Sequence, residues 1–210
     1  MAFSITSGIL KELRSYAQLN NIPIIQPEVA KLLTVLELIA RPKKILEIGT
    51  AIGYSSILLA QNLQPGGLID TIENSGTMLE MARENIKMSG CQDIINTIAG
   101  DAIEVVRYLD KKYDLIFLDA AKGQYPELLP DCLRLLDLGG ILVSDNVLYK
   151  GMVANDRLIV RRKKTIVKRL REYLDCICND KNIDTCILPV GDGVAVSVKK
   201  LNNNLKEQRT

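Results

Sequence analysis

The chain has 210 residues, of which 47% are hydrophobic and 25% charged, with a net charge of +2. This length suits one domain with a full sheet, the apolar stretches are too short to cross a bilayer, and the charge is too small to identify a nucleic-acid binder by itself. The absence of histidine excludes Ser-His and Cys-His catalysis and histidine-ligated zinc, so acid–base work falls to Lys, Asp, Glu, Tyr or Cys.

The start of the chain and its cysteines indicate the compartment. Residues 1–10 contain no basic region before an apolar core and no small-residue cleavage site, so we expect no secretion and a cytoplasmic location. The five cysteines are odd in number and irregularly spaced, and we expect them to be reduced and mostly packed. Cys176-x-Cys178 is conceivable as half of a metal site, but no second pair accompanies it.

Two helices are expected ahead of the sheet, at residues 4–20 and 27–40. Apolar residues recur there at helical spacing, and Pro23 and Pro27 break the chain between them. We therefore divide a single domain, residues 1–210, into N-terminal helices (1–41), a sheet core (42–200) and a polar tail (201–210).

Strands and helices then alternate. The predicted strands are 44–49, 67–73, 94–99, 113–119 and 139–145, and the predicted helices between and after them are 54–63, 75–89, 102–109, 125–136 and 157–178. Short apolar strands alternating with helices indicate a parallel sheet covered on both faces.

Two further strands, near 182–188 and 193–199, have no helix between them. They are joined through Pro189-Val-Gly-Asp-Gly193, so they should pair antiparallel. The predicted fold class is α/β: a doubly wound, seven-stranded, mainly parallel sheet with an antiparallel last strand.

A glycine-containing turn follows the first strand. Glu47-Ile-Gly49-Thr-Ala-Ile-Gly53 joins strand to helix, where glycine permits a tight turn and close approach of a ligand. Glu73, at the end of the next strand, is placed to accept both hydroxyls of a ribose, and Asp101-Ala102 after the third strand to hold an adenine edge. Taken alone, the glycines are equally compatible with a structural turn, and their spacing argues against NAD and ATP phosphates.

Polar residues also follow the fourth and fifth strands. Asp119, Asp145 and Asn146 form an oxygen-only trio that suits a hard divalent cation such as Mg²⁺, and neighbouring strand ends can bring them to one ion. Seen singly, Asp119 is equally plausible as a helix cap and Asp145-Asn146 as a turn.

Lys122 follows Asp119 within one turn and is the candidate general base. A nearby divalent cation disfavours the protonated amine and leaves it able to take a proton. The alternative is a solvated lysine in the first turn of a helix, where the helix dipole disfavours a cation.

Together these motifs resemble the catechol and caffeoyl-CoA type O-methyltransferases over about residues 25–200. The resemblance is carried by Leu46-Glu-Ile-Gly49, Gly53-Tyr-Ser55, Glu73, Gly100-Asp101, Asp119-Ala-Ala-Lys122, Asp145-Asn146 and Gly191-Asp-Gly193. It implies S-adenosylmethionine as methyl donor, Mg²⁺ or a similar cation on Asp119, Asp145 and Asn146, Lys122 as catalytic base, and a homodimer.

The same resemblance implies how the cofactor is held. Ser55 and the loop from Gly49 to Gly53 would hold the methionine end, Glu73 the ribose, and Asp101 with Ala102 the adenine. The expected cofactor-binding residues are Ile25, Glu47, Gly49, Gly53, Ser55, Glu73, Asp101, Ala102 and Asp119.

The acceptor is a separate question. Ala120 and Ala121 stand where catechol-methylating relatives place bulky residues, and the segment 146–155 with the basic stretch after it most resembles the bacterial tRNA 5-hydroxyuridine methyltransferases. That resemblance implies methylation of the 5-hydroxyl of the wobble uridine to 5-methoxyuridine, because the 5-hydroxyl and 4-carbonyl oxygens can chelate one ion as catechol oxygens do. Candidate contacts to an anticodon loop are Lys150, Arg157, Arg161, Arg162, Lys164, Lys168 and Arg169.

Three alternatives remain. One is a catalytically silent binding module that keeps the cofactor fold, against which Asp119, Lys122 and Asp145 count. The basic residues can also be the solvent-exposed face of a helix whose apolar stripe includes Val167, Leu170 and Leu174. The acceptor can equally be a small molecule with vicinal hydroxyls, such as a catechol.

Overall fold

The computed structural model describes the backbone of residues 2–201 and the side chains of residues 8–201. Residues 202–210 of the predicted polar tail lie outside the described residues. Helices α1 (Ala2–Leu19) and α2 (Pro27–Ala40) come first, as predicted. Pro27 begins α2, a position where the missing N–H of proline removes no helical hydrogen bond.

Seven strands form one sheet in the order β3-β2-β1-β4-β5-β7-β6. The strands are β1 (Lys44–Ile48), β2 (Leu68–Glu73), β3 (Ile95–Ala99), β4 (Tyr113–Leu118), β5 (Leu136–Ser144), β6 (Ile183–Leu188) and β7 (Val194–Lys199). Strand β7 runs antiparallel to β5 and β6, and the other neighbouring strands are parallel. The predicted fold class is confirmed.

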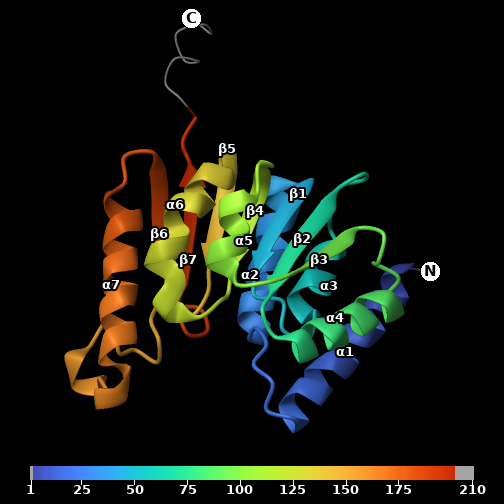
Figure 1. Cartoon of the computed structure of the whole chain (residues 1–210), viewed down its shortest axis with the longest axis horizontal. Coiled ribbons are helices and arrows are strands. Elements are labelled where there is room, and N and C mark those ends of the chain that lie inside the picture. Colours follow the sequence, from blue (N-terminus) through green and yellow to red (C-terminus); the bar gives the residue numbers. More distant parts are fainter. Residues whose placement is uncertain (1, 202–210) are drawn as a thin grey trace, which may run out of the picture.

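Helices cover both faces of the sheet (Figure 1). They are α3 (Tyr54–Ala60), α4 (Gly76–Met88), α5 (Ala102–Tyr108), α6 (Tyr125–Leu135) and α7 (Lys164–Asn179). Side chains alternate along each strand, so Phe117 and Val143 pack with α1–α4, whereas Ile116 and Leu142 pack with α5–α7. The two cores, one on each face, explain the near-continuous apolar strands.

The expected helix 157–178 begins later than predicted. Residues 156–158 and 161–163 form two short 3-10 turns, η2 (Asp156–Leu158) and η3 (Arg161–Lys163), and α7 starts at Lys164. The β-branched pair Ile159 and Val160 takes extended backbone between these turns, which interrupts the helix. Strand β5 also starts three residues before its predicted beginning.

The cysteines are all free, as expected, but they are not mostly packed. Cys91 and Cys132 are buried, whereas Cys176, Cys178 and Cys186 are exposed on α7 and β6. None of the helices within residues 2–201 combines the length and the apolar character that crossing a bilayer requires.

The strand register brings the predicted site residues to one edge. Ile48 pairs with Ile72 and with Leu118, and Leu118 pairs with Ser144. The residue after each of these parallel strands therefore lies at the carboxyl edge of the sheet, where such folds bind ligands.

Candidate active site

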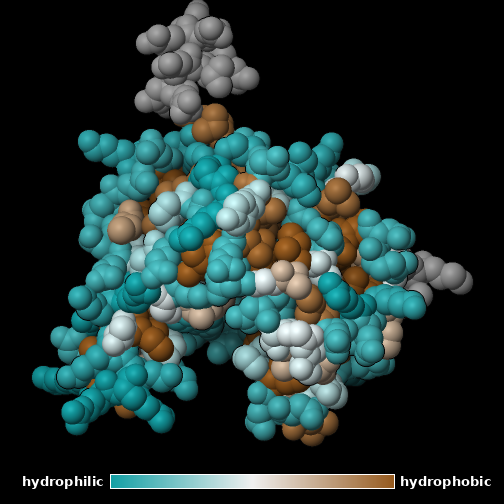
Figure 2. Space-filling model, in the orientation of Figure 1, coloured by the Kyte–Doolittle hydropathy of each residue, from teal (hydrophilic) through white to brown (hydrophobic). Residues whose placement is uncertain are grey.

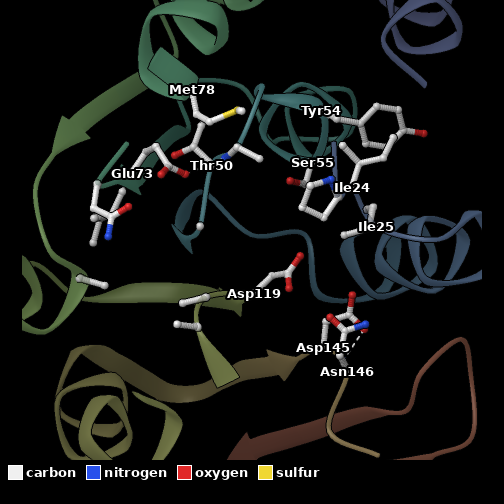
Figure 3. A pocket seen from close by; sticks show the side chains of 18 of the residues that line it. Ile24, Ile25, Thr50, Tyr54, Ser55, Glu73, Met78, Asp119, Asp145 and Asn146 are labelled. Atoms are coloured by element: carbon white, nitrogen blue, oxygen red, sulfur yellow. Dashed lines mark hydrogen bonds between the residues drawn. The ribbon is translucent and has the colours of Figure 1, made fainter. Parts of the chain in front are cut away.

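A cavity of about 630 Å³ opens at this carboxyl edge. The strand order reverses there between β1 and β4, the point at which a doubly wound sheet forms its binding crevice. The walls come from the α1–α2 connection, the loops after β1, β2 and β3, the turn after β4 and the residues after β5. Figure 3 shows side chains from these segments around a common space.

The loop after β1 meets the turn after β4 so closely that one position requires glycine. Gly49 has a φ of +108°, and a Cβ there would lie 2.3 Å from the carbonyl oxygen of Asp119. Gly49 and Ser55 line the cavity, as predicted for cofactor-binding residues, but Gly53 does not. Gly53 has a φ of +83° at the start of α3, against α4, so glycine suits the turn there, and its expected ligand contact stays a prediction.

Glu73, the predicted ribose acceptor, ends β2 in the cavity wall. One carboxylate oxygen accepts from the Ala51 N–H at 2.9 Å, and the other from the Ser75 N–H at 2.9 Å. Each oxygen keeps a lone pair for a ligand, so the carboxylate is fixed and can still accept from a diol. Glu73 lies near Met78, across the cavity from Asp145 (Figure 3).

Glu47 lies beneath the cavity and is not part of its lining. Its Oε2 accepts hydrogen bonds from Ser56 and, at 2.6 Å, from Thr71. Burial raises the pKa of Glu47 to about 7, and nearby hydroxyl groups, beginning with Ser55, oppose this shift. The predicted direct contact with the cofactor is therefore corrected: Glu47 sits behind Ser55, and Ser55 faces the cavity.

The two residues predicted to hold an adenine edge, Asp101 and Ala102, lie at the start of α5. Asp101 caps α5, because its Oδ1 accepts from the Ile103 N–H at 2.9 Å, and its Oδ2 lies 3.4 Å from the Gln124 amide nitrogen. Ala102 and Gly100 line the cavity and Asp101 does not. The Asp101 carboxylate caps α5 and keeps lone pairs for a ligand, so its contact with an adenine stays a prediction.

Asp119, Asp145 and Asn146 meet at the other end of the cavity. Figure 3 shows the Asp119 and Asp145 carboxylates and the Asn146 amide directed into the same region. Asp145 is only 1% exposed, and burial, followed by the neighbouring Asp119 charge, raises its pKa to about 7. Its Oδ1 accepts from the Asn146 N–H at 2.6 Å.

This trio fits a hard divalent cation. Its donors are all oxygen atoms, and a cation would offset the repulsion between two closely placed carboxylates. The third ligand of this trio is an amide, so the trio differs from a cluster of three or more His, Cys, Asp or Glu side chains. Residues 2–201 contain no such cluster arranged to hold a metal. Two carboxylates and an amide leave several coordination positions for water and for acceptor oxygens. This suits Mg²⁺, which usually keeps several water ligands.

Lys122 lies at the same end of the cavity. Its Nζ lies 2.5 Å from Asp119 Oδ1, and the lysine side chain is 16% exposed. Lys122 begins the short helix η1 (Lys122–Gln124), which leads into α6. The structure therefore brings the predicted base and the predicted metal ligands together.

One wall was largely missed by sequence reasoning. Residues 22–26, which connect α1 to α2, all line the cavity, although only Ile25 was predicted. The prolines there indicated a break in the chain but gave no sign of a ligand. Tyr54 also lines the cavity, and Arg14 of α1 holds its hydroxyl at 2.5 Å; its place in the Gly53-Tyr-Ser55 motif was the available signal.

The predicted RNA contacts form a surface separate from the cavity, which we call the basic segment (residues 150–169). None of the seven predicted residues lines the cavity; Lys150, Arg157, Arg161, Arg162 and Lys164 are exposed. The segment forms a hydrophilic protrusion at the lower left of Figure 2, below α7 in Figure 1.

Among residues 8–201, the side chains of two of the seven have charged or hydrogen-bonding partners. Lys168 lies 3.7 Å from Glu172. Arg169 donates to the Gly123 carbonyl oxygen at 2.6 Å and pairs with Glu127 at 2.6 Å. The Arg169 guanidinium therefore ties α7 to the turn that carries Lys122, and its expected contact with RNA stays a prediction.

The strand order, the glycine turn after β1, the acid after β2 and the cavity at the carboxyl edge define a methyltransferase of the doubly wound α/β class. The model of the O-methyltransferase family matches residues 2–200. The chain belongs to that family.

Individual relatives agree with this family. A protein named catechol O-methyltransferase from Niastella koreensis is 30% identical over 84% of this chain and 82% of its own. A Staphylococcus aureus structure provisionally named a caffeoyl-CoA O-methyltransferase has a TM-score of 0.85 and 34% identity, covering 90% of this chain and 91% of that one. A Bacillus cereus O-methyltransferase, solved with S-adenosylhomocysteine, has a TM-score of 0.82 and 29% identity over 92% and 91%.

Proposed function

We propose that the chain transfers a methyl group from S-adenosylmethionine to one of two neighbouring oxygens of an acceptor, with Mg²⁺ or a similar divalent cation. The observation that carries the proposal is the grouping of Asp119, Asp145 and Asn146 with Lys122 at one end of the cavity, facing Glu73 at the other. The Bacillus cereus relative solved with S-adenosylhomocysteine supports the choice of donor.

The donor end is formed by the loops after β1, β2 and β3. When bound, S-adenosylmethionine supplies an electrophilic methyl group on a sulfonium sulfur. Glu73 is placed to accept from the ribose hydroxyls, Ser55 and the Gly49 loop to hold the methionine end, and Gly100 and Ala102 to flank the adenine. Residues 22–26 form one wall of the cavity.

The acceptor end is formed by the residues after β4 and β5. Asp119, Asp145 and Asn146 would hold the cation, which when bound lowers the proton affinity of an acceptor hydroxyl. With the cation present, its charge would disfavour the protonated form of Lys122, and the neutral amine can take the proton from that hydroxyl. The Lys122 amine lies 2.5 Å from Asp119, next to this site. The acceptor oxygen then forms a bond to the methyl carbon, the carbon–sulfur bond breaks, and S-adenosylhomocysteine leaves.

A small molecule with vicinal hydroxyls is one acceptor class. The relative named catechol O-methyltransferase supports it. The cavity is also large enough for a nucleoside donor and a small ring together.

The wobble 5-hydroxyuridine of tRNA is the second candidate, with 5-methoxyuridine as product. The basic segment supports it, because Arg157, Arg161, Arg162 and Lys164 are exposed cations that RNA phosphates can reach. Ala120 and Ala121 line the cavity with small side chains, which suits a larger acceptor. Both acceptors present two adjacent oxygens, so one arrangement of residues suits either.

Mass spectrometry of products tests these proposals. The protein is incubated with S-adenosylmethionine and Mg²⁺, and with catechol or with tRNA containing 5-hydroxyuridine. We expect a methylated product from one acceptor, lost in the presence of a chelator. Full activity in chelator, or no product from either acceptor, would contradict the proposal.

Variants separate the two acceptors and test the base. Lys122→Ala should lose turnover and keep S-adenosylhomocysteine binding, whereas Lys87→Ala, an exposed control on α4, should change neither. If the acceptor is tRNA, the double change Arg161→Ala and Arg162→Ala should lower turnover and reduce its salt dependence, since each lost phosphate contact removes about one released counterion. Catechol turnover should not respond to that change.

We also propose a homodimer formed through α1 and α2. Tyr16, Leu19, Leu38 and Ile39 expose large apolar side chains on these helices, which supports burial against a second copy. Light scattering after size-exclusion chromatography should give twice the 23.3 kDa chain mass. Leu38→Asp should shift the protein to monomer, and a monomeric unaltered protein would contradict the proposal.

A further inference from the structure

Tyr125 joins the two strand ends that carry the proposed metal ligands. Its side chain is fully buried, and its hydroxyl lies 3.0 Å from the carbonyl oxygen of Leu118 and 3.0 Å from that of Asp145. Leu118 is the last residue of β4 and directly precedes Asp119. A single hydroxyl therefore contacts the backbone just before Asp119 and the backbone of Asp145 itself.

The same hydroxyl acts at a backbone turn. Asn146 has a φ of +54°, a conformation that few residues other than glycine adopt. The Asp145 carbonyl group that Tyr125 contacts forms the peptide bond entering Asn146, so the hydroxyl restrains the turn that aims the Asn146 amide. The Asp145 N–H also donates to the Leu118 carbonyl oxygen at 3.0 Å, which closes the junction.

The ring of Tyr125 is held as firmly as its hydroxyl. Tyr173 packs against it edge to face, with ring centroids 5.3 Å apart. On another side, Lys122 Nζ lies 5.6 Å from the centroid of the Tyr125 ring. Tyr125 thus touches the base and the backbone of both strand ends, although it does not line the cavity.

We propose that Tyr125 is a positioning residue for the divalent cation: its hydroxyl fixes the spacing of the β4 and β5 ends and the turn at Asn146, and so raises the affinity of the Asp119, Asp145 and Asn146 site. This inference rests on the metal site of the proposed function. Groups that hold metal ligands in place change metal affinity by about 10- to 100-fold when they are removed.

Mn²⁺ binding followed by electron paramagnetic resonance tests the proposal without any acceptor. Tyr125→Phe keeps the ring beside Lys122 and removes only the hydroxyl. Tyr113→Phe is the matched control, because Tyr113 is also a buried tyrosine and its hydroxyl donates to Asp70 at 2.7 Å, away from the cavity lining. We expect about tenfold weaker Mn²⁺ binding for Tyr125→Phe and less than twofold change for Tyr113→Phe.

Binding of S-adenosylhomocysteine and the melting temperature confirm that both variants are folded. Unchanged Mn²⁺ affinity in Tyr125→Phe, or equal weakening in both variants, would overturn the positioning role and leave the proposed function intact. If the unaltered protein binds no Mn²⁺, or binds it as well after Asp145→Ala, the metal site itself is wrong and the inference fails with it.

Discussion

Glu37 is a buried acid outside the active site, and it makes stability depend on pH. The residue lies in α2 with no exposed surface, and neither carboxyl oxygen has a hydrogen-bond partner within residues 2–201. Burial raises the pKa of Glu37 from 4.5 to about 8; the amide of Asn62 opposes this shift, although it makes no well-formed hydrogen bond. Glu37→Gln replaces the acid by a neutral group of the same shape.

The direction in which stability changes with pH follows from the number of protons that the folded and unfolded states bind. Between pH 4.5 and about 8 the folded chain keeps the Glu37 proton, which the unfolded chain has released. The free energy of unfolding therefore has its full Glu37 contribution below pH 4.5, loses it as the pH rises, and levels off above pH 8. At about 1.4 kcal/mol per pH unit, this pKa shift can lower the free energy of unfolding by at most about 5 kcal/mol. Local relaxation around the charged form should reduce this change to roughly 3 kcal/mol.

Urea denaturation followed by circular dichroism at pH 5, 7 and 9 measures how the free energy of unfolding depends on pH. The unfolding free energy of Glu37→Gln minus that of the unaltered protein should grow by roughly 3 kcal/mol from pH 5 to pH 9. Glu28→Gln is the control, because Glu28 is an exposed acid in the first turn of the same helix. A difference that stays constant with pH for Glu37→Gln would refute the reasoning.

Three further changes test the site. Asp145→Ala should abolish Mn²⁺ binding and metal-dependent turnover and leave S-adenosylhomocysteine affinity nearly unchanged; calorimetry with each ligand measures both. Gly49→Ala should destabilise the fold, because its Cβ would lie 2.3 Å from the Asp119 carbonyl oxygen, and a loss of about 2 kcal/mol would lower the melting temperature by roughly 4–8 °C. Arg169→Ala should lower kcat about tenfold with little change in KM, because the turn that carries the base loses its tie to α7, whereas Lys168→Ala should have no effect; steady-state kinetics compares the two.

The parts of the site that lie at strand ends were predictable. Apolar runs mark the strands, and a parallel sheet places all their carboxyl ends at one edge. Glu73, Asp119 and Asp145 each lie at or next to such an end, so their sequence positions also gave their positions in space. Lys122 was predictable for the same reason, because it follows Asp119 within one turn.

Residues whose roles depend on contacts distant in sequence were not predictable. Glu47 reads as a strand-end acid, but strand alternation turns its side chain into the core toward Thr71, 24 residues away. Arg169 reads as one of several surface cations, and only the packing of α7 on η1 brings it to Gly123, 46 residues away. Nothing local to Tyr125 indicates that its hydroxyl meets two carbonyl groups.

Backbone hydrogen bonds between neighbouring strand ends join the proposed donor and acceptor ends of the cavity. The Asp119 N–H donates to the Ile48 carbonyl oxygen at 2.9 Å, and the Gly49 N–H donates to that of Ile72 at 3.0 Å. The donor loop and the turn with the proposed metal ligand therefore share a hydrogen-bonded junction, packed closely enough that only glycine fits at residue 49. In a methyl transfer an error of about 1 Å in the approach of the acceptor oxygen can cost about 100-fold in rate. Placing both ends on adjacent parallel strands, with Tyr125 bridging β4 and β5, makes that distance a property of the sheet and not of mobile side chains.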